Sequence, residues 1–138
     1  MIIWPDGIRE LNKSDVDRLL MKKRYFFCQE TEIQEHEFLI REVGGKSVGA
    51  TRLNGRICLR LNYCPQAGAQ ICKGSVVSAL LIGPDQSVNL DCSRPLVRCP
   101  WHGWEFDLDS GRTVFESKMR LAFLTYELEE GEVFVWMR

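Results

Sequence analysis

Two short segments of the sequence combine cysteine, proline and glycine in a way that favours a metal site. The first reads Cys-Pro-Gln-Ala-Gly over residues 64–68, and the second reads Cys-Pro-Trp-His-Gly over residues 99–103. Proline with a glycine close behind favours a sharp turn, and glycine leaves backbone N–H groups open to a ligand. Thiolate and imidazole are good ligands for iron and zinc. We therefore expect two neighbouring loops that hold a metal centre between them.

Histidine is scarce in this chain, which has six cysteines but only His36 and His102. No secretion signal is expected in the N-terminal segment, so we interpret the cysteines as reduced thiols or metal ligands. His36 lies in a Glu-His-Glu segment just before an expected strand, and we interpret it as an exposed loop residue. A site that needs two histidines is therefore short of one.

The second segment continues as Gly-Trp-Glu-Phe-Asp to residue 107, followed by Ser-Gly-Arg at 110–112. This run resembles the second cluster-binding loop of Rieske-type [2Fe–2S] proteins. The first segment, with Ile-Cys-Lys-Gly at 71–74, resembles the first loop of their ferredoxin-like members. The resemblance covers about residues 30–138. The aromatic second loop is closer to the ferredoxins and ring-hydroxylating oxygenases than to the respiratory type, which has a further loop cysteine.

The resemblance implies a ligand set in which Cys64 and Cys99 hold the inner iron and His102 holds the outer iron. The family has a second histidine two residues after the first cysteine, and this chain has Gln66 there. A carboxamide oxygen is a weaker donor for iron than imidazole, so the resemblance implies an altered and labile [2Fe–2S] site. If the site has lost its function, no cofactor is expected.

Cys72 is the alternative fourth ligand, because it follows the first loop closely. A site of Cys64, Cys72, Cys99 and His102 would suit [2Fe–2S] or zinc, whereas the other interpretation places Cys72 in the core. We interpret Cys28, Cys58 and Cys92 as small buried hydrophobic residues. The two loop tryptophans, at 101 and 104, either shield the site and shape a docking surface or simply pack.

The elements expected to position the loops are mostly strands. Residues 14–24 are expected to form one helix, with Ser14 as N-cap. Gly44-Gly45 and Asn54-Gly55 are expected to turn β-hairpins, and residues 83–95 are expected to form a polar excursion. Strands are expected at 38–43, 46–53, 56–62, 76–82, 96–99, 105–108, 120–128 and 132–137. This pattern predicts an all-β antiparallel sandwich or barrel with a short N-terminal helix. The resemblance implies the Rieske type of this fold, with a small cluster-binding subdomain.

The chain divides into an expected N-terminal extension, residues 1–29, and a Rieske-like domain, residues 30–138, with loops at about 62–74 and 97–107. The 138 residues carry a net charge of −1 and are 45% hydrophobic, which suits one globular domain. This charge balance gives no basic surface for nucleic acid, and no segment suits a membrane span. We expect a soluble, cytoplasmic protein.

Three functions remain open for this chain. The first is a ferredoxin-like electron carrier that serves a redox partner protein or enzyme subunit. The second is a cluster-free accessory subunit of a larger oxidoreductase, and the third is a structural Cys/His zinc domain. In each case the chain is expected to assist catalysis rather than perform it. The sequence does not indicate an oligomeric state.

Overall fold

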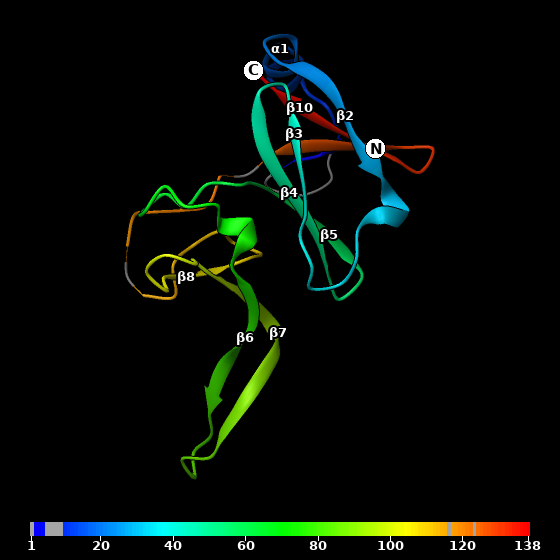
Figure 1. The fold of residues 1–138 in the computed structure, drawn as a ribbon. Helices are drawn as coiled ribbons and strands as arrows, with labels where there is room; N and C mark the ends of the chain where they lie inside the picture. Colours follow the sequence, from blue (N-terminus) through cyan, green and yellow to red (C-terminus); the bar gives the residue numbers. More distant parts are fainter. Residues whose placement is uncertain (1, 5–9, 116, 123) are drawn as a thin grey trace.

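The computed structural model describes residues 2–4, 10–115, 117–122 and 124–138 of an all-β protein with one α-helix (Figure 1). Its strands form three antiparallel sheets. The first sheet has the order β1 (Ile2–Ile3), β9 (Thr125–Glu129), β10 (Glu132–Met137) and β2 (Lys23–Gln29). The second contains β3 (Leu39–Val43), β4 (Lys46–Leu53) and β5 (Arg56–Leu61), and the third contains β6 (Ser75–Ile82), β7 (Val88–Arg98) and β8 (Glu105–Asp107).

The first two sheets form a sandwich that is the base of the molecule. Alternate residues of β10, such as Val133 and Val135, are fully buried, as the period of two in a half-buried strand requires. They share one apolar core with Val48 and Leu59 of the second sheet. This core fixes β4 and β5, and β5 leads into the first cysteine loop.

The third sheet and the two cysteine loops form a smaller unit beside the base. A second apolar core joins them to the base sheet and contains Leu53 from β4 and Phe106 from β8. The 3₁₀ turn η2 (Ile71–Lys73) closes the first loop, and its Ile71 is buried in the same core. The expected division into a base and a loop-bearing subdomain is therefore confirmed.

Both expected hairpin turns are present between strands of the second sheet. Asn54 and Gly55 have φ values of 53° and 82°, and Gly44 and Gly45 have 57° and 80°. Two consecutive positive φ values match the twist of antiparallel strands, which explains the choice of these residues. A Cβ at Gly44 would lie 2.7 Å from the ring of Tyr25, so this glycine also lets β2 pack closely.

The N-terminal helix differs from its expected limits of 14–24. Helix α1 is Lys13–Leu20, and its N-cap is Asn12 rather than Ser14. The Asn12 side chain accepts a hydrogen bond from the Asp15 N–H at 2.9 Å, and the Asp15 carboxylate accepts one from the Asn12 N–H. The basic run after the helix begins β2, because this segment pairs with β10.

Strands β1 and β2 were not expected, and both join the base sheet from within the predicted extension 1–29. The boundary at residue 29 stays a prediction. The expected strand at 120–128 begins only at Thr125, and Phe123 within it lies outside the described residues.

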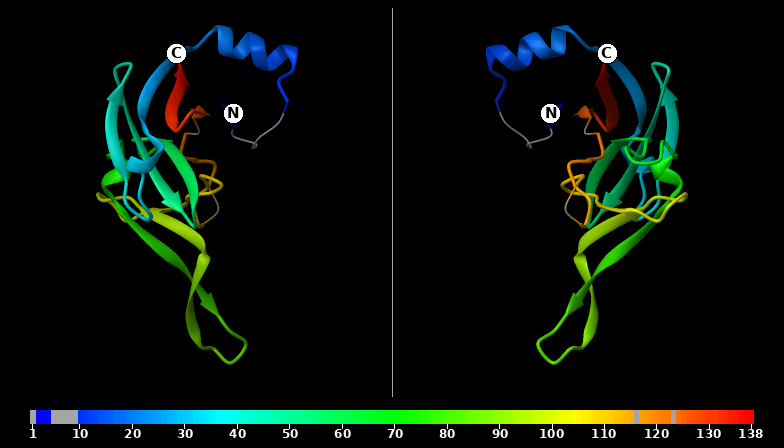
Figure 2. Two further views of the ribbon diagram at one scale, coloured as in Figure 1. Left: turned by 90° about the vertical axis from the view of Figure 1, so that its right-hand side faces the viewer. Right: turned by 90° about the vertical axis from the view of Figure 1, so that its left-hand side faces the viewer.

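The expected polar excursion at 83–95 is wrong for most of its length. Strand β7 begins at Val88, so only a short turn separates it from β6, and the two form a long hairpin that projects from the base (Figure 2). The register shifts between Ser78 and Ala79, with Pro95 opposite Ser78. Proline is rare inside strands, so Pro95 suggested a loop. The register irregularity beside it lets β7 accommodate this proline.

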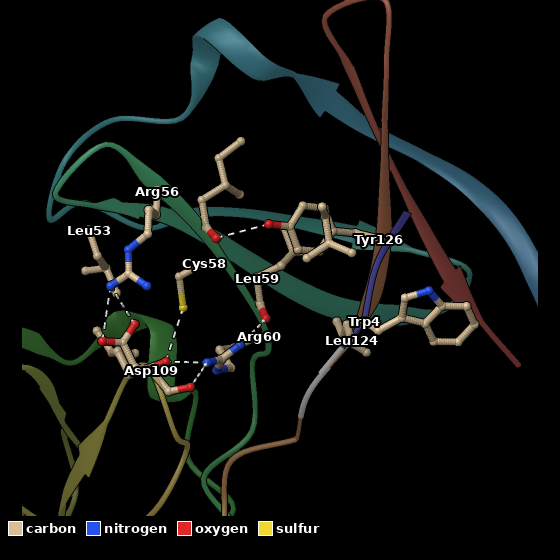
Figure 3. A pocket seen from close by; sticks show the side chains of 12 residues that line it. Trp4, Leu53, Arg56, Cys58, Leu59, Arg60, Asp109, Leu124 and Tyr126 are labelled. Carbon is tan, nitrogen blue, oxygen red and sulfur yellow. Dashed lines mark hydrogen bonds and ion pairs between the residues drawn. The ribbon is translucent and has the colours of Figure 1, made fainter. Parts of the chain in front are cut away.

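A cavity of about 130 Å³ lies at the seam between the base and the smaller unit (Figure 3). The buried guanidinium of Arg60 reaches across this seam and donates to the carbonyl oxygens of Leu108 and Asp109. Arg56 pairs with the Asp109 carboxylate at 3.1 Å. These contacts fasten the chain that follows the second loop to β5, the strand that leads into the first loop.

Among the described residues, no helix has both the length and the apolar character needed to cross a membrane.

Candidate metal centre

The first loop follows β5 and is closed by its own backbone. The Cys64 N–H donates to the Ala69 carbonyl at 2.8 Å, and the Gly68 N–H donates to the Cys64 carbonyl at 2.8 Å. Gly68 has a φ of 73°, a conformation that favours glycine. The chain therefore reverses between Cys64 and Ala69 and forms a compact loop.

The second loop joins β7 to β8 and repeats this hydrogen-bond pattern at the same spacing. The Cys99 N–H donates to the Trp104 carbonyl at 2.7 Å, and the Gly103 N–H donates to the Cys99 carbonyl at 3.0 Å. Gly103 has a φ of 72°, almost the value of its counterpart in the first loop. Two loops with one backbone design thus present a cysteine at the same position.

The structure brings the two predicted cysteine ligands together. Cys64 and Cys99 are 0% and 2% exposed, and the Cys99 thiol lies close enough to Cys64 to raise its pKa. Burial raises the pKa of the Cys64 thiol, while the backbone N–H groups of Gln66 and Ala67 donate to its sulfur and oppose that rise. A sulfur that receives two N–H donors is prepared to carry negative charge, as a thiolate ligand must.

The other two predicted ligands meet at the outer end of the loops. His102 Nδ1 lies 3.2 Å from Gln66 Oε1, with His102 exposed and Gln66 half-buried. The loops therefore place a buried pair of sulfurs at the inner end and a nitrogen and an oxygen at the outer end. The donor set that the resemblance implies is divided in the same way, with Gln66 in one of the two imidazole places, and its role as a ligand set stays a prediction.

Cys72 lies beside β4 in the second apolar core, which also contains Cys64 and Cys99. A Cβ at Gly49 of β4 would come within 2.3 Å of its sulfur, which shows how closely Cys72 packs there. Burial, with nearby Cys58 as a smaller cause, raises the pKa of Cys72 to about 12. Within the described part of the chain, no three His, Cys, Asp or Glu side chains converge on one metal position, and ligation by Cys72 stays a prediction.

The remaining cysteines and His36 belong to neither of the two loops. Cys28 and Cys58 are buried free thiols, as expected, and burial raises the pKa of each. Cys92 is on β7, where the structure does not describe the side chain. His36 is exposed, and its backbone N–H donates to Arg52.

The two loop tryptophans differ in their surroundings. Trp101 is 65% exposed at the outer end. Trp104 is half-buried and packs edge-on against Phe115, with 4.7 Å between the ring centroids. Tyr63 is 51% exposed and lies beside Gly68, and neither it nor Phe115 was singled out from the sequence. The outer end of the loops therefore carries accessible aromatic surface.

Asn62 is a residue of the site that sequence reasoning missed. It is buried, and its amide donates to Ser47 Oγ at 3.0 Å and to Gln70 Oε1 at 3.2 Å, while its Oδ1 accepts from the Cys72 N–H at 2.8 Å. One side chain thus ties both ends of the first loop to the base. A polar residue between an apolar strand and a cysteine loop is the only signal for it in the sequence.

Comparison with known proteins agrees with this geometry. The family model for the Rieske [2Fe–2S] domain matches residues 23–122. A protein assigned as NADH-dependent nitrite reductase small subunit from Mycobacterium tuberculosis aligns with a TM-score of 0.63 and 18% identity, covering 85% of this chain and 96% of that one. No curated protein matches the sequence.

Two ferredoxins have the same fold. The ferredoxin of Sphingomonas yanoikuyae aligns with a TM-score of 0.62 and 17% identity, covering 84% of this chain and 100% of its own. The ferredoxin of carbazole 1,9a-dioxygenase from Nocardioides aromaticivorans aligns with a TM-score of 0.60 and 16% identity, covering 83% and 95%. The matched family model spans more than half of the sequence and contains both cysteine loops. This chain belongs to the Rieske [2Fe–2S] domain family.

Proposed function

We propose that this chain is an electron-transfer protein whose [2Fe–2S] cluster is held by Cys64, Cys99, His102 and Gln66. The observation that carries the proposal is the pairing of the loops. Two loops of one backbone design join two buried thiols at the inner end and His102 with Gln66 at the outer end. A bound [2Fe–2S] cluster would supply one-electron oxidation and reduction at this point.

The chain's own residues set the conditions for that chemistry. The inner end of the site is shielded from water, because Cys64 and Cys99 are buried there. The N–H groups of Gln66 and Ala67 stabilise negative charge on the Cys64 sulfur. His102 is exposed at the outer end, which gives an electron a short route to a partner. The fold thus insulates one end of the site and opens the other.

Gln66 sets this chain apart from the ligand pattern that its sequence resembles. Its carboxamide oxygen is a neutral, hard donor, whereas imidazole is a borderline donor that suits iron well. The proposal therefore includes a cluster that is bound less firmly and is more sensitive to solvent. Because this cluster would have one histidine ligand in place of two, it would also couple electron transfer to protonation less strongly.

The proposed partner is another redox protein, which would dock over the outer end of the loops. Trp101, Tyr63 and Phe115 are 65%, 51% and 46% exposed. Exposed aromatic side chains of this kind are typical of the centre of a protein interface. Among structures of the same fold, one is a complex of a reduced oxygenase with an oxidised ferredoxin, in keeping with this class of partner.

A cluster-free accessory subunit is the second candidate. The observation that favours it is that the protein alone closes the site, through the Cys64–Cys99 and Gln66–His102 contacts. The two loops would then serve as a rigid surface for a larger enzyme. This candidate and the electron carrier share the docking surface and differ in metal content.

Anaerobic purification followed by iron, acid-labile sulfide and zinc analysis separates these candidates. The electron carrier is expected to contain about two irons and two sulfides per chain, as the formula of the cluster requires. A folded protein that contains neither iron nor sulfide after anaerobic reconstitution would overturn the proposal and favour the accessory subunit. One zinc per chain without sulfide would instead establish a zinc domain.

A further inference from the structure

A second cavity, of about 200 Å³, lies at the end of the base that carries α1 and the C-terminal end of β10. In Figure 1 this end is remote from the two cysteine loops. The cationic side chains of Lys22, Lys46 and Arg138 line the cavity, and none of the described residues that line it is acidic. They come from three places in the chain: the turn after α1, the start of β4 and the end of β10.

None of these three cations is neutralised by a described carboxylate. Lys22, Lys46 and Arg138 form no ion pair within the described residues, although seven other pairs occur there. Partial burial lowers the pKa of Lys22, and the positive charges of Arg138 and Arg18 lower it further. A chain with a net charge of −1 therefore gathers three cationic side chains, none of them in an ion pair with a described residue, at one cavity.

A hydroxyl group and an indole N–H lie beside these charges. Thr125 lines the cavity and is only 4% exposed, so its hydroxyl is held close to the three cations. Trp136 lies directly opposite Thr125 on β10 and also lines the cavity, and its buried Nε1 has no hydrogen-bond partner among the described residues. Buried polar groups are normally satisfied, so an unmatched donor at a cationic cavity indicates a missing acceptor.

We propose that this cavity binds the phosphate group of a small molecule. A phosphate group carries about two negative charges and oxygens that accept several hydrogen bonds. Lys22 and Lys46 supply point charges, Arg138 supplies a planar fork of donors, and Thr125 supplies a hydroxyl. The cavity is smaller than the roughly 300 Å³ or more of most drug-sized sites, so it suits a phosphate group or a small phosphate ester.

The test is a titration of isotope-labelled protein followed by nuclear magnetic resonance at constant ionic strength, with chloride as the control anion. Inorganic phosphate and glycerol 3-phosphate are titrated separately. We expect saturable shifts of the Trp136 indole and Thr125 amide signals with at least one of them. Tighter binding of the ester would assign the site to phosphate monoesters, and equal or tighter binding of phosphate would assign it to the free ion.

Variants show whether the cavity is responsible. Lys22→Met and Thr125→Val are each expected to weaken phosphate binding, Lys22→Met by roughly tenfold, as for the loss of one charge-assisted hydrogen bond. Lys73→Met, which removes an exposed lysine from η2, is the matched control and should leave binding unchanged. No saturable shift, the same shifts with chloride, or unchanged binding by Lys22→Met would overturn the proposal. The experiment needs no cluster, so it is independent of the electron-transfer proposal.

Discussion

At the scale of single residues, the chemistry of the site depends on the pair formed by Gln66 and His102. Their Oε1 and Nδ1 atoms face each other at 3.2 Å, so both side chains already point to one place. Replacing one imidazole by a carboxamide weakens a ligand without displacing the loop that carries it. The proposed site is therefore altered in donor strength and unaltered in overall design.

Gln66→His restores the histidine of the family pattern, and we expect it to increase cluster retention. Because imidazole is the better donor for iron, iron and sulfide content after aerobic gel filtration should rise several-fold over the native protein. Gln34→His, which adds a histidine at an exposed position remote from the loops, is the control. Equal retention in Gln66→His and the native protein would show that Gln66 is not at a ligand position.

The ligand candidates could be predicted because they lie within short motifs. Cys64, Cys99 and His102 each lie within five residues of a loop glycine with a positive φ, and local turn chemistry fixes their geometry. Asn62 could not be predicted in the same way. Its partners Ser47 and Cys72 are 15 and 10 residues away, and only the folded base brings them together.

At the scale of elements, the two loops are coupled to each other through backbone packing. A Cβ at Gly74, just after η2, would lie 1.9 Å from the carbonyl oxygen of Arg98. Arg98 immediately precedes Cys99. The end of the first loop therefore packs against the beginning of the second, and the absence of a side chain at Gly74 permits this contact.

We expect Asn62→Ala to loosen the first loop and lower the free energy of unfolding by about 2 kcal/mol, because it leaves the buried Cys72 N–H without an acceptor. Urea denaturation of the metal-free protein measures this change. Ser47→Ala removes one acceptor of the Asn62 amide and retains the contact with Cys72, so its loss should be smaller. A loss of stability in Ser47→Ala equal to that in Asn62→Ala would contradict the role given to the Cys72 contact.

Strand β2 shows why some elements escaped prediction. Lys22 to Arg24 follow an amphipathic segment, and basic residues suit the last turn of a helix. The chain instead enters β2 at Lys23, which pairs with Met137 at the other end of the sequence. A partner more than a hundred residues away overrides local preference, and no short-range pattern indicates it.

At the scale of the whole molecule, two buried groups that can lose a proton make the stability of the fold sensitive to alkaline pH. Burial raises the pKa of Cys72 and of Tyr126, each to about 12. Cys72 packs where the base meets the smaller unit, and the Tyr126 hydroxyl donates to the Ile57 carbonyl at 3.1 Å. The folded protein keeps both protons at pH values where an unfolded chain releases them.

Stability is therefore expected to be fully present below about pH 9 and to fall as the pH rises toward 12. Over that range the unfolded chain binds fewer protons, so each such group lowers the free energy of unfolding by at most about 1.4 kcal/mol per pH unit. Urea denaturation of the reduced, metal-free protein at pH 8 and pH 10.5 measures this. Cys72→Ala should lose less stability between the two pH values than the native protein, and an equal loss would contradict the assignment.

The most direct test of the account is the number of nitrogen ligands at the outer end of the site. Electron spin-echo envelope modulation of the dithionite-reduced protein resolves nitrogens bound directly to iron. The account predicts a paramagnetic [2Fe–2S] signal with one strongly coupled nitrogen, from His102, in the native protein and two in Gln66→His. Two coupled nitrogens in the native protein, or no such signal after anaerobic reconstitution, would contradict it.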